Sequence, residues 1–363
     1  MPDDLTAPDL RTGLRRLDNQ HICGKKAATA AAAVAHLGMV QAQDYLAALW
    51  AVGLRMAQAT ETDVEAAVAE RQIVRTWPAR GTLHFVAALD VHWMLALLTR
   101  RAVVASGGRL RRLDLDESVF RQCRTVLTRA LCGGRRLTRP ELFQLLESQR
   151  IATAGQRGIH ILWKLAQDGL LCFGPRQGKQ HTFVLLEEWI PRGPDLSREQ
   201  ALAELARRYF NGHGPASLDD FSWWSGLTKA EASLAVQLGR GWLTEETWDG
   251  IKRWSGESSD PLPAARPRLQ LLPAFDEYLV GYQDREDVLD PRSAKRINAG
   301  GGMLNPVIVI DGQVRGTWRR VLKRDRVIVQ PAWFSPAGAE DQASLARAAE
   351  RYGRFLQLAA EVE

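Results

Sequence analysis

The chain has 363 residues, 45% of them hydrophobic, so two to four packed modules are expected. No apolar run approaches the ~20 residues needed to cross a bilayer. The first ten residues are acidic where a secretion signal is basic, so we expect a cytoplasmic protein with no membrane contact. The four cysteines form no CxxC pair, so we predict reduced core thiols and no metal site or disulfide framework.

The formal net charge is +6, but the charge is unevenly distributed along the chain. Between residues 71 and 136 there are thirteen arginines and only four acidic residues. Such a concentration of arginine predicts a surface that binds a polyanion, of which nucleic acid is the commonest example.

The first third of the chain reads as three helices and a hairpin. Helix-forming or amphipathic runs cover residues 27–37, 45–56 and 62–70, and two β runs around a Pro/Gly turn cover residues 72–86. Three helices followed by a β-hairpin is the element order of a winged helix, so we predict one here.

The same order of elements recurs twice. In the second round, helices are predicted over residues 117–131, 137–149 and 155–169, with a hairpin over 170–186. The third round consists of helices 198–210, 217–227 and 228–239, followed by strands near 242–244 and 251–254. This is a tandem repeat of a folded module rather than a short-period solenoid.

A Pro/Ser-rich stretch at residues 256–268 marks a boundary, after which the segments 269–282, 305–320 and 326–334 read as strands, with a hairpin turn at 311–313. A helix over 342–358 closes the chain. The predicted fold class is α+β, with three tandem winged-helix units and a small C-terminal β-barrel with a terminal helix. The predicted domains are residues 1–110, 111–195, 196–258 and 265–363.

Two glutamines stand one residue apart in an otherwise apolar run, at Gln41 and Gln43. On a helix they would point about 200° apart, whereas in an extended segment they share a face. Gly38 is placed to end one helix and Asp44 to cap the next, so an extended segment between them is the simplest interpretation. Alternatively, both amides satisfy orphan backbone groups at helix ends.

The Gln-Ala-Gln stretch, together with "RTWPARGTLHFV" (residues 75–86) and "LLPAFDEYLVGYQDR" (residues 271–285), resembles the winged-helix DNA glycosylases of the AlkZ-like type. The resemblance covers nearly the whole chain. It implies three winged-helix units and a barrel that wrap around duplex DNA, and excision of N-alkylated purines, including bulky adducts or interstrand crosslinks left by natural products. A related branch carries Gln-x-Asp, from which this chain departs at Gln43, and this difference favours bulky monoadducts.

By the motif match, Gln41 and Gln43 are the expected catalytic pair. An N7- or N3-alkylated purine is already cationic and leaves without a proton from a general acid. The site then has only to position a water molecule and stabilise the cationic sugar, and a neutral amide carbonyl is suited to both. No lysine lies in the motif, so we expect a monofunctional enzyme without lyase chemistry and without a cofactor.

Five further residues are candidates for binding DNA or the lesion. Arg80 and His84 lie in the arginine-rich segment and its hairpin, and Arg176 and Lys179 lie at the tip of the second hairpin. Asp276 could orient a group of the site. The alternatives are a satisfied strand histidine for His84 and an N-cap or hydrogen-bonded corner for Asp276.

Two other functions stay open on sequence grounds. A transcription regulator is one, because winged helices are more often binding modules than enzymes. A protein that binds a lesion without cutting is the other. Three units in one chain fit a monomer on double-stranded DNA that carries an alkylated purine better than they fit a dimeric regulator.

Overall fold

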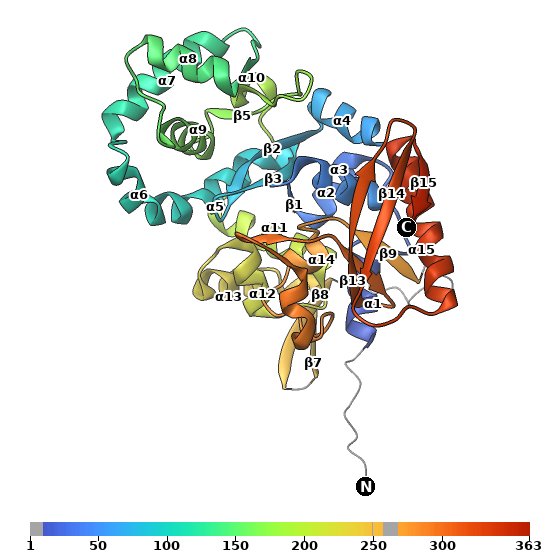
Figure 1. Cartoon of the computed structure of the whole chain (residues 1–363). Coiled ribbons are helices and arrows are strands. Elements are labelled where there is room, and N and C mark those ends of the chain that lie inside the picture. Colours follow the sequence, from blue (N-terminus) through green and yellow to red (C-terminus); the bar gives the residue numbers. More distant parts are fainter. Residues whose placement is uncertain (1–9, 249, 257–267) are drawn as a thin grey trace.

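The first helical unit follows the sequence prediction closely. The computed structural model of the chain (Figure 1) describes residues 10–248, 250–256 and 268–363. Thr60 caps one predicted helix in a capping box with Asp63, which satisfies backbone donors at the helix start. The elements are α2 (Ala30–Leu37), β1 (Met39–Gln41), α3 (Tyr45–Leu54), α4 (Glu61–Ala69), β2 (Ile73–Ala79) and β3 (Thr82–Ala87).

The second unit shares a sheet with the first. Helices α5 (Val91–Ala105) and α6 (Gly107–Arg112) lead into it. Its elements are α7 (Glu117–Leu131), β4 (Leu137–Thr138), α8 (Arg139–Ser148), α9 (Arg157–Gln167), β5 (Leu171–Phe173), β6 (Thr182–Leu185) and α10 (Leu186–Trp189). The strand order is β1-β3-β2-β5-β6-β4, in which Arg75 of β2 pairs with Phe173 of β5. The first two predicted domains, residues 1–110 and 111–195, are therefore joined by pairing between their strands.

The third unit lies beside the first sheet in Figure 1. It consists of α11 (Arg198–His213), α12 (Leu218–Ser225), α13 (Lys229–Leu238) and the hairpin of β7 (Leu243–Trp248) and β8 (Ile251–Gly256). Three helices before a hairpin thus occur three times in the described chain, while the assignment of each unit as a winged helix stays a prediction.

The C-terminal region forms a half-barrel. Strands β9 (Leu269–Leu272), β12 (Val307–Ile310), β13 (Gln313–Leu322), β14 (Arg326–Trp333) and β15 (Ala359–Val362) make one sheet with β15 and β9 at its edges, so the closed barrel that we expected is not confirmed. Helix α15 (Ala339–Leu356) packs on it, and a small hairpin joins β10 (Asn298–Gly300) to β11 (Met303–Leu304). Most of the predicted boundary, residues 257–267, lies outside the described residues.

Two expectations for the fold were wrong, and one helix was not expected. Residues 277–280 form a short helix, α14 (Glu277–Val280), instead of continuing a strand, because Asp276 caps it through the backbone N–H of Tyr278. Helix α1 (Leu10–Asn19) was not predicted from the sequence; it docks on the third unit through an ion pair from Arg15 to Glu246. The thiol of Cys132 is exposed rather than in the core.

The sheet of the first unit separates two hydrophobic clusters. Val40 and Phe85 lie in the cluster with α2, α3 and the C-terminal sheet, whereas Met39 and Val86 lie in the cluster with the third unit. Each strand therefore presents alternate residues to two different cores, as an antiparallel strand buried on both faces does. Among the described helices, none is long and apolar enough to cross a bilayer.

Candidate active site

The two glutamines lie on a short extended segment between two capped helices. Gly38 ends α2 with a φ of 80°, a left-handed conformation that glycine adopts without strain. Asp44 caps α3 through its side chain. The chain between these caps is a strand at residues 39–41, so the extended conformation expected between the two caps is found in its first part, and a bend follows at residue 43.

Burial alternates along this segment. Val40 and Ala42 are fully buried, whereas Gln41 is half-buried and Gln43 is exposed. Because alternate residues of an extended chain point to opposite faces, the Gln41 side chain lies on the side away from Val40, and Gln43 stands in a bend just after the strand. Both carboxamides therefore lie outside the buried core of the segment.

The two carboxamides differ in their contacts. Gln43 Oε1 accepts a hydrogen bond from the backbone N–H of Leu83 at 3.4 Å, which partly fits the alternative role of satisfying backbone groups. The carboxamide of Gln41 makes no hydrogen bond to any residue that the structure describes. Its strand neighbour in the ladder is His84. The Gln41 amide is thus uncommitted and partly accessible.

Arg75 holds the backbone between the two glutamines. Its Nε and Nη2 both donate to the carbonyl oxygen of Ala42, at 3.0 and 2.8 Å. The guanidinium lies near the rings of Tyr45 and Phe173, 5.4 and 4.8 Å from their centroids. Burial lowers the pKa of Arg75 to about 10, so the guanidinium stays charged at neutral pH.

Glu277 holds the other side of the segment. Strand β1 is at the edge of its sheet, and the backbone N–H of Gln41 donates to Glu277 Oε1 at 2.7 Å. Trp224 Nε1 donates to Oε2 at 2.9 Å, and His213 Nε2 lies 3.3 Å from the same oxygen. Burial alone would raise the pKa of this fully buried carboxyl, but His213, His84 and the Gln41 N–H hold it below its usual range. Glu277 is therefore an anion at neutral pH.

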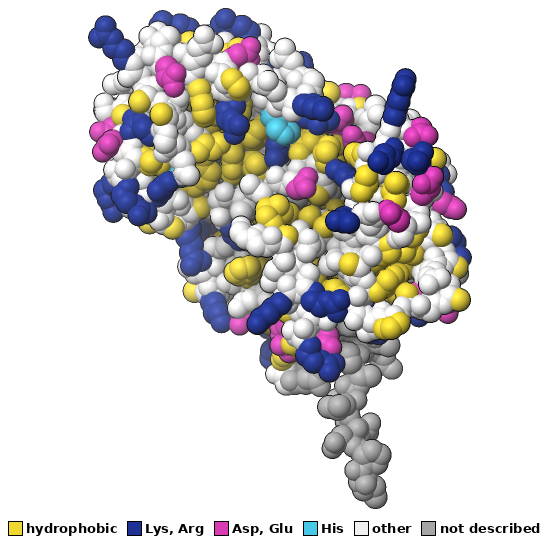
Figure 2. Space-filling model, viewed as in Figure 1, with side chains coloured by type: hydrophobic (Ala, Val, Ile, Leu, Met, Phe, Trp, Pro, Cys, Tyr) yellow, Lys and Arg dark blue, Asp and Glu magenta, His cyan; other side chains and the backbone are white. Residues whose placement is uncertain are grey.

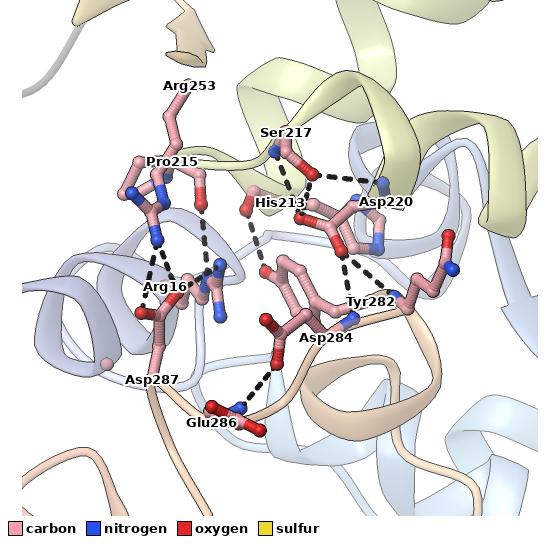
Figure 3. A network of polar contacts seen from close by, with 12 residues as sticks. Arg16, His213, Pro215, Ser217, Asp220, Arg253, Tyr282, Asp284, Glu286 and Asp287 are labelled. Carbon is pink, nitrogen blue, oxygen red and sulfur yellow. Dashed lines mark hydrogen bonds and ion pairs between the residues drawn. The ribbon is translucent and has the colours of Figure 1, made fainter. Parts of the chain in front are cut away.

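A polar network anchors the segment that follows Glu277 to the third unit (Figure 3). The hydroxyl of Tyr282 donates to the His213 carbonyl at 2.7 Å, and Asp220 Oδ1 accepts from the two backbone amides that follow Tyr282. Arg16 of α1 pairs with Asp287 at 3.0 Å. The position of the Glu277 carboxylate is thus fixed from α1, the third unit and the C-terminal region together.

His84 is fully buried in β3, in one cross-strand row with Gln41 and Thr76. Its Nδ1 lies 3.0 Å from the carbonyl oxygen of Thr82. Its Nε2 and the hydroxyl of Thr76 are buried without a hydrogen-bond partner in the described chain. Burial and the nearby Arg80 lower the pKa of His84 to about 4, so the ring is neutral at physiological pH. A direct phosphate contact, as predicted from the sequence, would need this buried ring to become accessible.

Arg80 lies on the turn between β2 and β3, with a φ of 52°. Its Nη1 donates to the carbonyl oxygen of Trp223 at 3.3 Å, near the end of α12, and the side chain is half exposed. The residue thus links the first hairpin to the third unit, and phosphate binding by its exposed part stays a prediction.

The two candidates on the second hairpin are in different environments. Arg176 is paired with Glu65 of α4 at 2.5 Å and lies over the ring of Tyr45, so its charge is already used within the protein. Lys179 is exposed at the turn, where a phosphate could reach it. Only Lys179 of this pair has the exposure expected of a backbone contact.

Asp276 is fully buried and makes a two-pronged ion pair with Arg55, whose Nη1 and Nη2 donate to the two carboxylate oxygens at 2.9 and 2.8 Å. Asp276 also caps α14. This geometry favours the structural alternative for Asp276 over a contact with the lesion.

The arginine-rich segment supplies an exposed basic surface. Figure 2 shows a group of Lys and Arg side chains at the left of the view, over the position that α6 has in Figure 1. Within residues 71–136 the exposed arginines are Arg71, Arg100, Arg101, Arg111, Arg112, Arg121, Arg129, Arg135 and Arg136. Within the described ranges, no three His, Cys, Asp or Glu side chains gather closely enough to hold a metal ion.

Comparison with known proteins decides the family. The model of the DNA glycosylase AlkZ-like family matches residues 34–355. The chain belongs to the AlkZ-like DNA glycosylase family. The interstrand DNA cross-link repair glycosylase of Streptomyces sahachiroi is 28% identical over 334 residues, which cover 84% of this chain and 86% of that protein. The solved structure of the Streptomyces sahachiroi DNA glycosylase AlkZ superposes with a TM-score of 0.80 at 23% identity, covering 99% of this chain and 100% of that one.

Within this AlkZ-like chain, sequence reasoning missed the residues that hold the glutamines. Arg75 and Glu277 stand inside the two strings that carry the family resemblance, and Glu277 follows Asp276 directly, so their types could have been noticed. Nothing in the sequence connects His213 or Trp224 with Gln41, because those contacts depend on how the third unit docks.

Proposed function

We propose that this AlkZ-like protein is a monofunctional DNA glycosylase that hydrolyses the N-glycosidic bond of cationic N7- or N3-alkylated purines, with Gln41 and Gln43 as the catalytic pair. The observation that carries the proposal is the geometry of the pair: two carboxamides outside the core, one residue apart on a backbone fixed by Arg75 and Glu277, with the Gln41 amide uncommitted.

The chemistry follows from the substrate's charge. The alkylated base leaves as a neutral molecule when its bond to C1′ breaks, and the positive charge passes to the sugar. A carboxamide oxygen accepts a hydrogen bond from the attacking water and faces the cationic sugar, while remaining uncharged itself. Unmodified purines are poor leaving groups without a proton donor, so intact DNA is not cut.

A lyase step is not supported by the surroundings of Lys26, the lysine nearest to the glutamine pair along the chain. Lys26 Nζ donates to the carbonyl oxygens of His21, Ile22 and Leu54, at 2.8, 2.5 and 3.0 Å. An amine held by three acceptors is not free to attack C1′. The product is therefore an intact abasic site.

The DNA partner is double-stranded, bound by a monomer through three winged-helix units and the C-terminal half-barrel. The exposed arginines support binding to the phosphate backbone. Bulky natural-product adducts are the proposed lesions. A relative named as an interstrand cross-link repair glycosylase supports the extension to crosslinks, in repair or in self-resistance.

Single-turnover incubation with a duplex that contains N7-methylguanine tests the proposal. The wild type should release the base and leave an alkali-labile, unbroken strand, and Gln41→Ala and Gln43→Ala should each slow release by about 10²-fold, as loss of one preorganised polar group does. The matched control is Gln122→Ala, which removes an exposed glutamine on α7 and should leave the rate unchanged.

Three outcomes would contradict this function. Tight binding of the lesion without base release indicates a lesion-binding protein. Palindrome-specific binding without release indicates a regulator. Strand cleavage without alkali, or trapping of the protein on DNA by borohydride, indicates an amine nucleophile and thus a bifunctional enzyme.

A further inference from the structure

Glu277 is a buried charge that the glutamine chemistry does not use directly. It is fully buried, so it cannot touch the substrate, and yet it accepts the backbone N–H of Gln41. An ionised carboxylate in a protein interior is stable only with several donors, and here Trp224, His213 and the Gln41 N–H supply them from three parts of the chain.

The carboxylate lies close to the place where the reaction develops charge. Glu277 Oε1 is 2.7 Å from the Gln41 nitrogen. A glutamine side chain reaches roughly 5 Å from its own backbone nitrogen. Any atom in contact with the Gln41 carboxamide is therefore within about 10 Å of the carboxylate, with protein between them.

Resting on the proposed function, we infer that Glu277 is a positioning residue that acts through Gln41 in two ways. It fixes the backbone of Gln41 from the open edge of β1, and its negative charge stabilises the cationic sugar of the transition state. The two glutamines are neutral, so Glu277 provides the anionic charge that the motif itself lacks. At the effective dielectric of a protein site, opposite charges at this range change an equilibrium by about tenfold or more.

The groups that face the carboxylate favour this role. His213 and Trp224 contact it directly, and the buried ring of His84, which is neutral at physiological pH, adds no opposing charge. Arg80 is a cation that also interacts with it; its side chain is only partly exposed, burial lowers its pKa, and a bound DNA phosphate would offset its charge. The fully buried charge of Glu277 is screened much less.

A charge-specific comparison tests the inference. The probes are two duplexes, one with a tetrahydrofuran abasic analogue and one with a pyrrolidine analogue, whose ring nitrogen is protonated and resembles the cationic sugar. The ratio of the two dissociation constants reports how strongly the site prefers positive charge. Glu277→Gln should lower that preference about tenfold, leave tetrahydrofuran binding within about twofold, and slow N7-methylguanine release by a similar factor of ten.

Two further variants separate charge from structure. Trp224→Phe removes a hydrogen bond to the same carboxylate but no charge, so its pyrrolidine preference should equal that of the wild type. Glu277→Asp keeps the negative charge but moves the carboxylate away from the Gln41 N–H. Release of N7-methylguanine should therefore slow, while the preference for the pyrrolidine probe should persist. The Asp variant also decides the matter if the Gln variant does not fold.

Equal losses of affinity for both probes in Glu277→Gln, or a lost preference in Glu277→Asp or Trp224→Phe, would overturn the electrostatic role. A wild-type rate and an unchanged preference in Glu277→Gln would overturn the inference entirely. In both cases the wild type still excises the base. A wild type that neither excises the base nor prefers pyrrolidine would instead overturn the proposed function.

Discussion

Replacing Asp276 with alanine tests whether this residue supports the fold or contacts the lesion. The variant leaves the Arg55 guanidinium, only 1% exposed, without its two-pronged partner. Breaking a buried ion pair from one side costs about 3–5 kcal/mol, and the lost cap of α14 adds about 1 kcal/mol. We expect the free energy of unfolding to fall by about 4–6 kcal/mol, which corresponds to a melting temperature lower by roughly 8–12 °C at about 2 °C per kcal/mol.

Urea denaturation followed by tryptophan fluorescence measures the change, and binding to a duplex with an abasic analogue at 10 °C measures the function of the folded fraction. The control is the double variant Arg55→Met/Asp276→Ala, which removes the stranded charge. It should be more stable than the sum of the single changes predicts, by about 2 kcal/mol. A loss below about 1 kcal/mol, combined with lost affinity for the lesion, would refute the structural role and support lesion binding.

Three other changes have distinct expected results. His84 has a folded pKa of about 4, so only the unfolded chain takes up its proton between pH 6.5 and 4. The free energy of unfolding of the wild type therefore falls as the pH is lowered through that window. Denaturation curves at pH 6.5 and pH 4 measure this decrease, which should be smaller by about 3 kcal/mol in His84→Gln. Arg75→Met removes both donors from the Ala42 carbonyl and should slow single-turnover base release about tenfold, with DNA affinity within about twofold; an unchanged rate would contradict its positioning role. Lys179→Ala should reduce the slope of log Kd against log salt by about 0.9, whereas Arg176→Gln, which loses contacts with Glu65 and Tyr45 inside the protein, should leave the slope unchanged; the reverse result would exchange their roles.

Local signals account for most of what the sequence predicted correctly. The caps at Gly38 and Asp44 are where the residue types placed them, since a cap depends on only a few neighbouring residues. The hairpin turn at residues 311–313 was found for the same reason. The extended glutamine segment followed from two such caps on either side of it.

Contacts between distant parts of the chain were beyond sequence reasoning. The assignment of 277–280 as a strand failed because its apolar run fits a buried helix equally well at that length. Arg176 was expected at an exposed tip, but the second hairpin packs toward α4, and Glu65 neutralises it. The acceptor of the Gln41 N–H stands 236 positions away, and no local pattern indicates such a pairing.

The glutamine segment is held by side chains from the first sheet, the third unit and the start of α14, the last of which lies near residue 277. A polypeptide that carries Gln41 and Gln43 but stops before α14 lacks the acceptor for the Gln41 N–H and leaves the outer edge of β1 uncovered. Truncated gene copies or recombinant fragments with the glutamine signature should therefore be counted as inactive remnants, and a premature stop codon as late as position 276 should be as severe as one at the start.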